Sequence, residues 1–123
     1  MNINTGALLT LTAAGAGTFV SADLANPEFH AASFVVRLST VTSASVVVTI
    51  NGKDAVSGQY YAILTSAAIT TAGVTNLQIG PGLLSTSNSS NSVLPATYQI
   101  SVAITGASAA VTGTVGASLV QAF

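Results

Sequence analysis

The sequence predicts an all-β protein, an antiparallel β-sandwich or jelly roll of about eight strands. Apolar residues recur mostly at every second position, and β-branched types dominate the alternating segments. Turn signals built from Gly, Asn, Ser and Pro recur roughly every ten residues, as they do in two-sheet antiparallel folds. A chain of 123 residues suits one domain. We therefore expect residues 1–6 to form an N-terminal arm and residues 7–123 to form a single β-sandwich domain.

The first part of the chain carries four predicted strands before the first strongly polar turn. They are Ala7–Thr12, Thr18–Ala22, Ala32–Val41 and Ser45–Ile50. The clearest is Ala32–Val41, in which Phe34, Val36 and Leu38 point to one side. Its connection to the next strand, Thr42–Ala44, is short enough for a hairpin, so we expect these two strands to pair. The intervening segment Asp23–His30 contains an Asn-Pro turn signal and is expected to be a loop.

The second part of the chain is predicted to supply four further strands. They are Tyr60–Leu64, Val74–Ile79, Thr97–Thr105 and Ala109–Val120, the last with possible bulges at Gly113 and Gly116. The tripeptide Gly80–Gly82, with Pro81 at its centre, should end the second of these sharply, since proline cannot donate to a strand ladder. The Ser/Asn-rich tract Leu83–Asn91 is expected to be an exposed loop.

Charge is the scarcest property of this chain. Two basic and three acidic residues give a net charge of −1, and only 4% of the residues are charged. So little positive potential argues against nucleic acid and against a membrane surface as partners. The long uncharged segment Ser101–Phe123 alternates and is interrupted by glycines, which favours a strand over a spanning helix. Met1–Asn4 lacks the basic start of a secretory signal, so we interpret the beginning as mature protein.

The residue types that carry most enzyme chemistry are nearly missing from the sequence. There is no cysteine, and His30 is the only histidine. Asp23, Glu28 and His30 share one short loop, which allows a weak cation site or an acid/base pair, or simply a polar loop tip or an inter-subunit hydrogen bond. Neither a nucleophile-elbow pattern nor a phosphate-binding glycine loop occurs. We expect no enzymatic activity and no cofactor.

The remaining polar and aromatic candidates point to interfaces. Arg37 lies mid-strand opposite the apolar side, where it should face solvent or pair with a carboxylate of a neighbouring subunit. Tyr60 and Tyr61 should face opposite sides of their strand, one in the core and one exposed. Core packing is the expected role of their rings, and an interface or a carbohydrate stack is the alternative. A surface poor in charge avoids the desolvation cost of burying ions and favours association. Symmetric structural assembly is therefore expected ahead of catalysis.

Several motifs resemble a family of small virion proteins of tailed bacteriophages. The strongest pair is Gly52–Lys53–Asp54 followed by Ser57–Gly58 and Tyr60–Tyr61, and then Leu94–Pro95 before Thr97–Tyr98. Further matches are Gly80–Leu83 and Val115–Leu119, so the resemblance runs from about Leu8 to Val120. Where such relatives often carry basic residues, this chain has Gln78 and Gln99.

The resemblance implies a capsid decoration or cement protein on the capsid surface of the virion, bound to the major capsid protein, and a homotrimer is expected. A tail or head-to-tail component, or a receptor- or glycan-binding head ornament, is the alternative. The expected docking elements are the N-terminal arm, the loop Asp23–His30 and the loop Leu83–Asn91. The interface candidates are Asn2, Asn4, Asp23, Glu28, His30, Arg37, Leu84 and Asn88.

Overall fold

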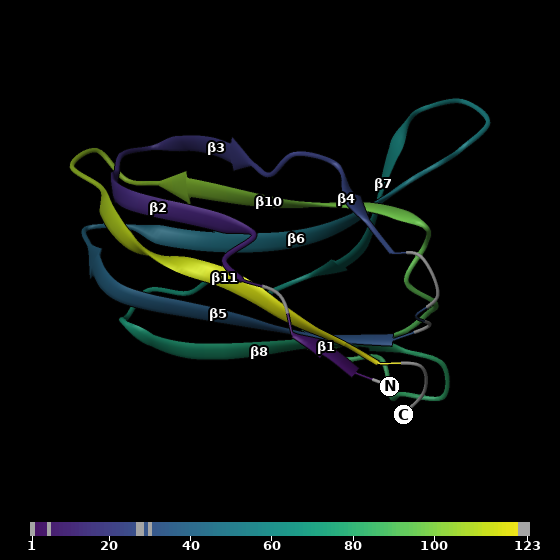
Figure 1. Cartoon of the computed structure of the whole chain (residues 1–123). Coiled ribbons are helices and arrows are strands. Elements are labelled where there is room, and N and C mark those ends of the chain that lie inside the picture. The colour runs from purple at the N-terminus through teal and green to yellow at the C-terminus, as the bar shows by residue number, and fades with distance from the viewer. Residues whose placement is uncertain (1, 5, 27–28, 30, 121–123) are drawn as a thin grey trace.

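Two β-sheets pack face to face in the computed structural model of the chain (Figure 1). The structure describes residues 2–4, 6–26, 29 and 31–120, and only the backbone of Asn2–Asn4 and of Val120. The strands within that part of the chain are β1 Asn2–Asn4, β2 Leu9–Ala14, β3 Gly17–Val20, β4 Leu24–Ala25, β5 Ala31–Thr42, β6 Ser45–Lys53, β7 Tyr60–Thr65, β8 Gly73–Gly80, β9 Ser89–Asn91, β10 Thr97–Thr105 and β11 Ala110–Val120. The predicted all-β sandwich is confirmed.

Each sheet has an edge that is built from two short strands. The first sheet runs β1-β11-β5-β8-β9, with β2 also paired to β11. The second runs β3-β10-β6-β7, with β4 also paired to β10. Pairing is antiparallel except between β8 and β9, which are parallel. The eight predicted strands correspond to β2, β3, β5, β6, β7, β8, β10 and β11, and the short strands β1, β4 and β9 were not predicted.

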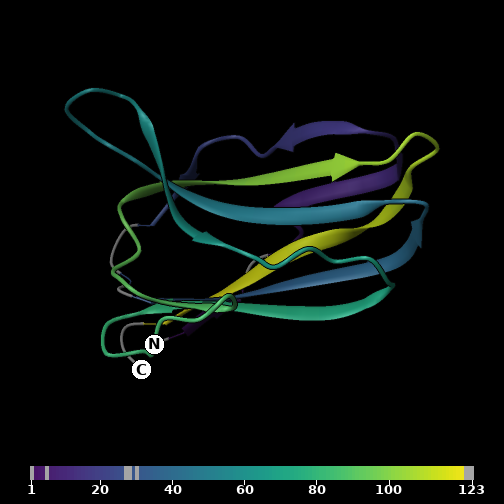
Figure 2. The ribbon, with the colours of Figure 1, turned by 180° about the vertical axis from the view of Figure 1, so that it is seen from behind.

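The N-terminal segment predicted as an arm pairs with the end of the chain. Asn2 lies opposite Val120 and Asn4 lies opposite Ser118 in the antiparallel ladder of β1 and β11. Residues 2–4 are thus an edge strand of the first sheet. The two ends of the described chain lie side by side at one end of the sandwich (Figures 1 and 2).

The core lies between the sheets and consists of the alternating apolar positions. Phe34, Val36 and Leu38 of β5 are buried, as predicted, and so is the alternate set that Tyr98 and Ile100 begin in β10. The Phe34 and Tyr98 rings meet across the two sheets with centroids 5.9 Å apart and planes at 70°, an edge-to-face contact. Burial raises the pKa of the Tyr98 hydroxyl.

The predicted hairpin between Ala32–Val41 and Ser45–Ile50 is wrong. Strand β5 pairs with β11 and β8 in one sheet, whereas β6 pairs with β10 and β7 in the other. Their short connection, with Ser43 at a φ of 50°, is an arch that crosses between the sheets. The connections β2–β3 and β10–β11 cross at the same end (Figure 1). The arches nest so closely that a Cβ on Gly106 would overlap the backbone oxygen of Ser43.

The predicted bulge in the last strand occurs at one of the two glycines. The ladder between β5 and β11 shifts register between Thr112 and Gly113. A Cβ on Gly113 would lie 2.9 Å from the Cα of Leu38, so a side chain has no room there. Pairing continues without a shift through Gly116.

At each edge of the second sheet, a buried serine hydroxyl accepts a backbone amide that would otherwise need a carbonyl of a neighbouring strand. The Ser21 hydroxyl accepts the Ile100 amide at 3.0 Å, while the Ser21 amide donates to the Ile100 carbonyl at 2.8 Å. Ser66 does the same with Val48, at 3.0 and 2.8 Å. Each hydroxyl then donates to the next carbonyl along its own chain. Both edges can therefore turn away from the ladder without leaving a buried amide unsatisfied.

Candidate functional site

The β6–β7 hairpin projects from the end of the sandwich opposite the arches (Figures 1 and 2). Its turn is held by Asp54, whose carboxylate accepts the Val56 amide at 3.2 Å and the Ser57 hydroxyl at 2.7 Å. The Ser57 amide also donates to this carboxylate, and Gly58, at a φ of 74°, donates to the Asp54 carbonyl. The Ser57 hydroxyl and the two amides lower the pKa of Asp54. The hairpin tip is therefore an ordered turn.

At the base of the hairpin, Asp23, Lys53 and Tyr60 form a cluster from three separate segments. The Lys53 ammonium lies 2.9 Å from Oδ2 of Asp23, and the Tyr60 hydroxyl donates to Oδ1. Lys53 Nζ also lies 5.6 Å from the centre of the Tyr60 ring. The segment between β3 and β4, the end of β6 and the start of β7 meet here because β4 and β6 flank β10. We call this group the Asp23 cluster.

The Asp23 cluster neutralises its own charge. The hydrogen bonds from Lys53 and then Tyr60 lower the pKa of the Asp23 carboxyl, and the bond to Asp23 raises the pKa of Lys53. The hydrogen bond to Asp23 also raises the pKa of the Tyr60 hydroxyl. The linked stability is lost as the pH falls through the pKa of Asp23, or as it rises through the pKa values of Tyr60 and Lys53. Because the cluster is exposed, water screens it and its contribution to folding is small.

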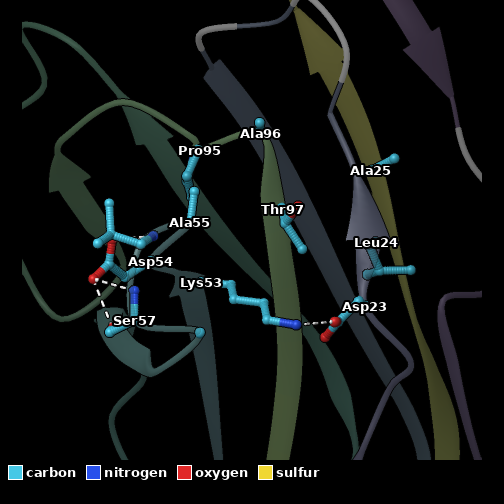
Figure 3. A pocket seen from close by; sticks show the side chains of 12 residues that line it. Asp23, Leu24, Ala25, Lys53, Asp54, Ala55, Ser57, Pro95, Ala96 and Thr97 are labelled. Carbon is cyan, nitrogen blue, oxygen red and sulfur yellow. Dashed lines mark hydrogen bonds and ion pairs between the residues drawn. The ribbon is translucent and has the colours of Figure 1, made fainter.

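A cleft of about 770 Å³ lies between the hairpin and the body of the sandwich (Figure 3). Figure 3 shows the Lys53 side chain crossing β10 toward Asp23, with Thr97 beside it and Pro95 near Ala55. The lining is mainly small and apolar apart from the charged Asp23, Lys53 and Asp54. It consists of Asp23, Leu24, Ala25, Lys53, Asp54, Ala55, Val56, Ser57, Gly58, Pro95, Ala96 and Thr97. We call this the hairpin cleft.

The sequence predicts that one of the two neighbouring tyrosines lies in the core and the other at the surface. The structure differs, because both are partly exposed. Tyr60 is 43% exposed and Tyr61 is 48% exposed. Both lie beyond the end of the core, where β7 enters the projecting hairpin. The Tyr61 ring occupies the space above Gly52, since a Cβ there would lie 2.6 Å from Tyr61 Cζ and 2.9 Å from Pro95 Cγ.

Asn26 links the segment before β5 to the segment before β10 at the hairpin end of the sandwich. It is not named as a functional residue in the sequence analysis. Its side chain is buried and donates to the carbonyls of Phe29, Leu94 and Pro95 at 2.6, 3.0 and 3.2 Å. Its Oδ1 accepts the Phe29 amide at 3.0 Å. The Asn-Pro pair was interpreted as a turn signal only, since a turn asparagine and a buried asparagine look alike in one sequence.

The predicted loop Leu83–Asn91 has its own hydrogen-bond network. The Ser89 hydroxyl bonds the Leu84 carbonyl and the Thr86 hydroxyl, and the Asn91 side chain accepts the Gly82 amide at 2.9 Å. The loop also pairs through β9 with β8. Leu84 is 80% exposed and Asn88 is exposed, and their place in an interface stays a prediction.

The other interface candidates are scattered. Arg37 is exposed on the outer face of the first sheet and makes no ion pair within the described residues. Asp23 pairs with Lys53, whereas Glu28 and His30 lie outside the described residues. Asn2 and Asn4 lie in β1, at the edge beside β11.

The outer faces of both sheets are almost uncharged. On the first sheet, the positions around Arg37 are Ser33, Val35, Ser39, Val74, Asn76, Gln78, Thr114 and Gly116. On the second sheet, the central outward positions are Val47, Thr49, Asn51, Gln99, Ser101 and Ala103, and Lys53 at the end of β6 is the charged one. We call these two surfaces the outer faces.

Among the described residues, no group of three or more potential ligands from His, Cys, Asp and Glu lies close enough to hold a metal ion. Within the same part of the chain, no helix is long and apolar enough to cross a membrane. In comparisons with known proteins, no family model, curated protein or solved structure matches this chain. The fold and the site define an all-β sandwich with a projecting hairpin, and its resemblance to phage virion proteins stays a prediction.

Proposed function

We propose that this protein is a structural component of a phage virion, a capsid decoration protein that binds copies of itself and the outer surface of the major capsid protein lattice. The observation that carries the proposal is the pair of nearly uncharged outer faces. Burying Ser, Thr, Asn and Gln side chains against a protein surface avoids the penalty of several kcal/mol that each buried unpaired ion costs. These faces therefore suit permanent contact with protein.

The distribution of the few charged groups supports the same proposal. Asp23 and Lys53 neutralise each other, and Asp54 is engaged by its own turn. A decoration protein gains its effect by repetition, because each copy adds buried area across subunit boundaries of the lattice. Contacts above about 1,000 Å² per copy are sufficient for specific binding.

The proposal is tested by sedimenting capsids that lack the protein with added purified protein. Under the proposal, the capsids are those of a tailed phage, assembled without this protein. Saturable co-sedimentation and a higher temperature of capsid disruption are expected. Protein that stays in the supernatant at all capsid concentrations would contradict the proposal.

A charge placed on each outer face in turn provides the matched variants. Asn76→Glu alters the first sheet and Thr18→Glu alters the second, and both positions are exposed. At least one of these variants should lose capsid binding by tenfold or more while keeping its far-ultraviolet circular dichroism spectrum. Full binding by both variants would show that neither outer face docks.

A glycan-binding head ornament is the second candidate, favoured by the exposed rings of Tyr60 and Tyr61 beside the hairpin cleft. Aromatic rings stack on sugars when one ring face is open. Tyr61→Ala should then abolish binding of a bacterial surface polysaccharide while capsid binding remains. A tail or head-to-tail component would instead co-sediment with tails and not with capsids.

A further inference from the structure

Two charged side chains have no ion-pair partner in the part of the chain that the structure describes. They are Arg37, on the outer face of the first sheet, and Asp54, in the turn of the projecting hairpin. The two charges have opposite signs, and both residues are exposed. In a chain with so few ionised groups, an ion pair that forms at an interface selects one partner and one orientation.

Arg37 and Asp54 cannot meet within one chain. Arg37 belongs to β5 and points away from the second sheet, since its neighbours Val36 and Leu38 are core-facing residues of that strand. Asp54 follows β6, which lies in the second sheet on the other side of the core. An ion pair between these two groups therefore requires two copies of the chain.

An exposed valine lies beside each of the two charges. Val74 is opposite Arg37 in the ladder between β8 and β5, so the two side chains are cross-strand neighbours on one face, and Val74 is 52% exposed. Val56 is 96% exposed, and its amide donates to the Asp54 carboxylate at 3.2 Å. We call Arg37 and Val74 together the Arg37 patch, and residues 54–58 the hairpin tip.

The Asp54 carboxylate has room for one further hydrogen bond from a partner. It accepts the Val56 amide on Oδ1, and the Ser57 amide and hydroxyl on Oδ2. A carboxylate offers about four acceptor positions, so one position stays open on Oδ1. The bonds from the turn, that of the Ser57 hydroxyl foremost, lower the pKa of Asp54, so the carboxylate is ionised at neutral pH. The Arg37 guanidinium suits the open position, because arginine presents several N–H donors in one plane.

We propose that the hairpin tip of one copy docks on the Arg37 patch of a second copy of this chain, with Asp54 against Arg37 and Val56 against Val74. Each of the two unpaired charges gains its counter-ion, so the contact buries no ion alone. Because tip and patch differ, the contact is heterologous, and it closes into a ring when the rotation between copies allows it. This inference rests on the self-association part of the proposed function and assigns its interface.

Charge variants of the full chain test the ion pair by sedimentation equilibrium. Arg37→Glu reverses the charge of the patch and should raise the dissociation constant of the multimer by tenfold or more. Asp54→Asn removes the charge of the tip, keeps an acceptor oxygen for the turn, and should raise this constant by threefold or more. Thr18→Glu, which adds a charge at an exposed position of the second sheet, is the control and should leave the constant unchanged.

Mixing the two interface variants gives the decisive comparison. The tip of the Arg37→Glu protein still carries Asp54, and the patch of the Asp54→Asn protein still carries Arg37. An equimolar mixture should therefore form a heterodimer with a dissociation constant close to that of the unaltered contact. A mixture that associates no better than either variant alone would overturn the inference.

Disulfide trapping locates the contact directly, because the sequence contains no cysteine. Val56→Cys and Val74→Cys are prepared as separate proteins, mixed and oxidised, so that only a contact between copies can join them. Val20→Cys replaces Val74→Cys in the control, since Val20 is 53% exposed on the second sheet. The 56–74 disulfide, identified by mass spectrometry, should form at tenfold or greater yield than the 56–20 disulfide. Equal yields, or a predominant 56–56 disulfide, would show that the tip does not dock on the Arg37 patch.

The outcomes also separate this inference from the proposed function. If the unaltered chain stays monomeric at every concentration, the docking of the tip is wrong, and homotrimer formation fails with it. If the Arg37→Glu protein self-associates as the unaltered chain does but no longer sediments with capsids, Arg37 binds the capsid lattice and the inference is overturned. In both cases, co-sedimentation of the unaltered chain with capsids still tests the proposed function.

Discussion

Replacing Asn26 with alanine should destabilise the fold strongly, because its one side-chain amide makes four hydrogen bonds. The substitution removes four hydrogen bonds and leaves the Phe29 amide and the Leu94 carbonyl without their partner in a buried site. Leaving a buried polar group unsatisfied costs about 1–3 kcal/mol. With partial entry of water, we expect a loss of about 3 kcal/mol in the free energy of unfolding, equivalent to roughly 10 °C in melting temperature.

The substitution Asn26→Asp separates the contribution of the hydrogen bonds to stability from that of packing, because aspartate has the same shape as asparagine but lacks the amide donor. At neutral pH its carboxylate would face the Phe29, Leu94 and Pro95 carbonyls, which the asparagine amide now bonds. Burial and these oxygens raise the pKa of the introduced carboxyl above about 3.9, its ordinary value. Between pH about 3.9 and the raised pKa, the native state binds more protons than the unfolded state. The free energy of unfolding therefore falls as the pH rises through this range.

Equilibrium urea unfolding, followed by circular dichroism at one fixed protein concentration, measures both variants. The fixed concentration matters because self-association would add to apparent stability. Asn76→Ala, at an exposed position, is the control and should change stability by less than about 0.5 kcal/mol. An Asn26→Ala protein within that same margin, or an Asn26→Asp protein whose deficit does not shrink at acid pH, would refute the reasoning.

Three further predictions follow from single contacts. Ser66→Ala removes the hydroxyl that accepts a buried β6 amide, so urea unfolding should show a loss of about 1–3 kcal/mol. Gly106→Ala forces a Cβ onto the neighbouring arch at a φ of 138°, and should lower the melting temperature sharply or prevent folding, whereas Gly15→Ala, whose Cβ would find its nearest neighbour at 3.9 Å, should be tolerated. Asp23→Asn removes the carboxylate that raises the pKa of Tyr60, so a nuclear magnetic resonance titration should show the Tyr60 hydroxyl ionising at lower pH; an unchanged pKa would contradict the cluster.

The sequence was sufficient to predict strands wherever alternation was strict. In β10, Ile100 and Val102 alternate with Gln99, Ser101 and Ala103 and are buried as expected. The short strand β4 was missed because two residues cannot display a period, and it forms only through its pairing with β10. Strand β9 was missed because its Ser/Asn composition is that of a loop.

Which sheet each strand joins could not be predicted from alternation. A short link such as Thr42–Ala44 can form either a hairpin within one sheet or an arch between two sheets. In both cases the joined strands bury every second residue, so the sequence pattern is the same. The same limit applies to the site, because the sequence places Lys53 next to Asp54 and gives no sign of its actual partner. Its partner is Asp23, 30 residues earlier, and the two meet because strand order brings their segments to either side of β10.

The four N-terminal strands of the sandwich pair with its two C-terminal strands. Strands β1 and β2 need β11, and β3 and β4 need β10, so neither edge can form until these two late strands have been synthesised. Such distant pairing delays folding until the whole sandwich has left the ribosome, with apolar segments open to water until then. Translation that stops before Thr97 would leave all four early strands without their partners, so truncated products should aggregate or be degraded.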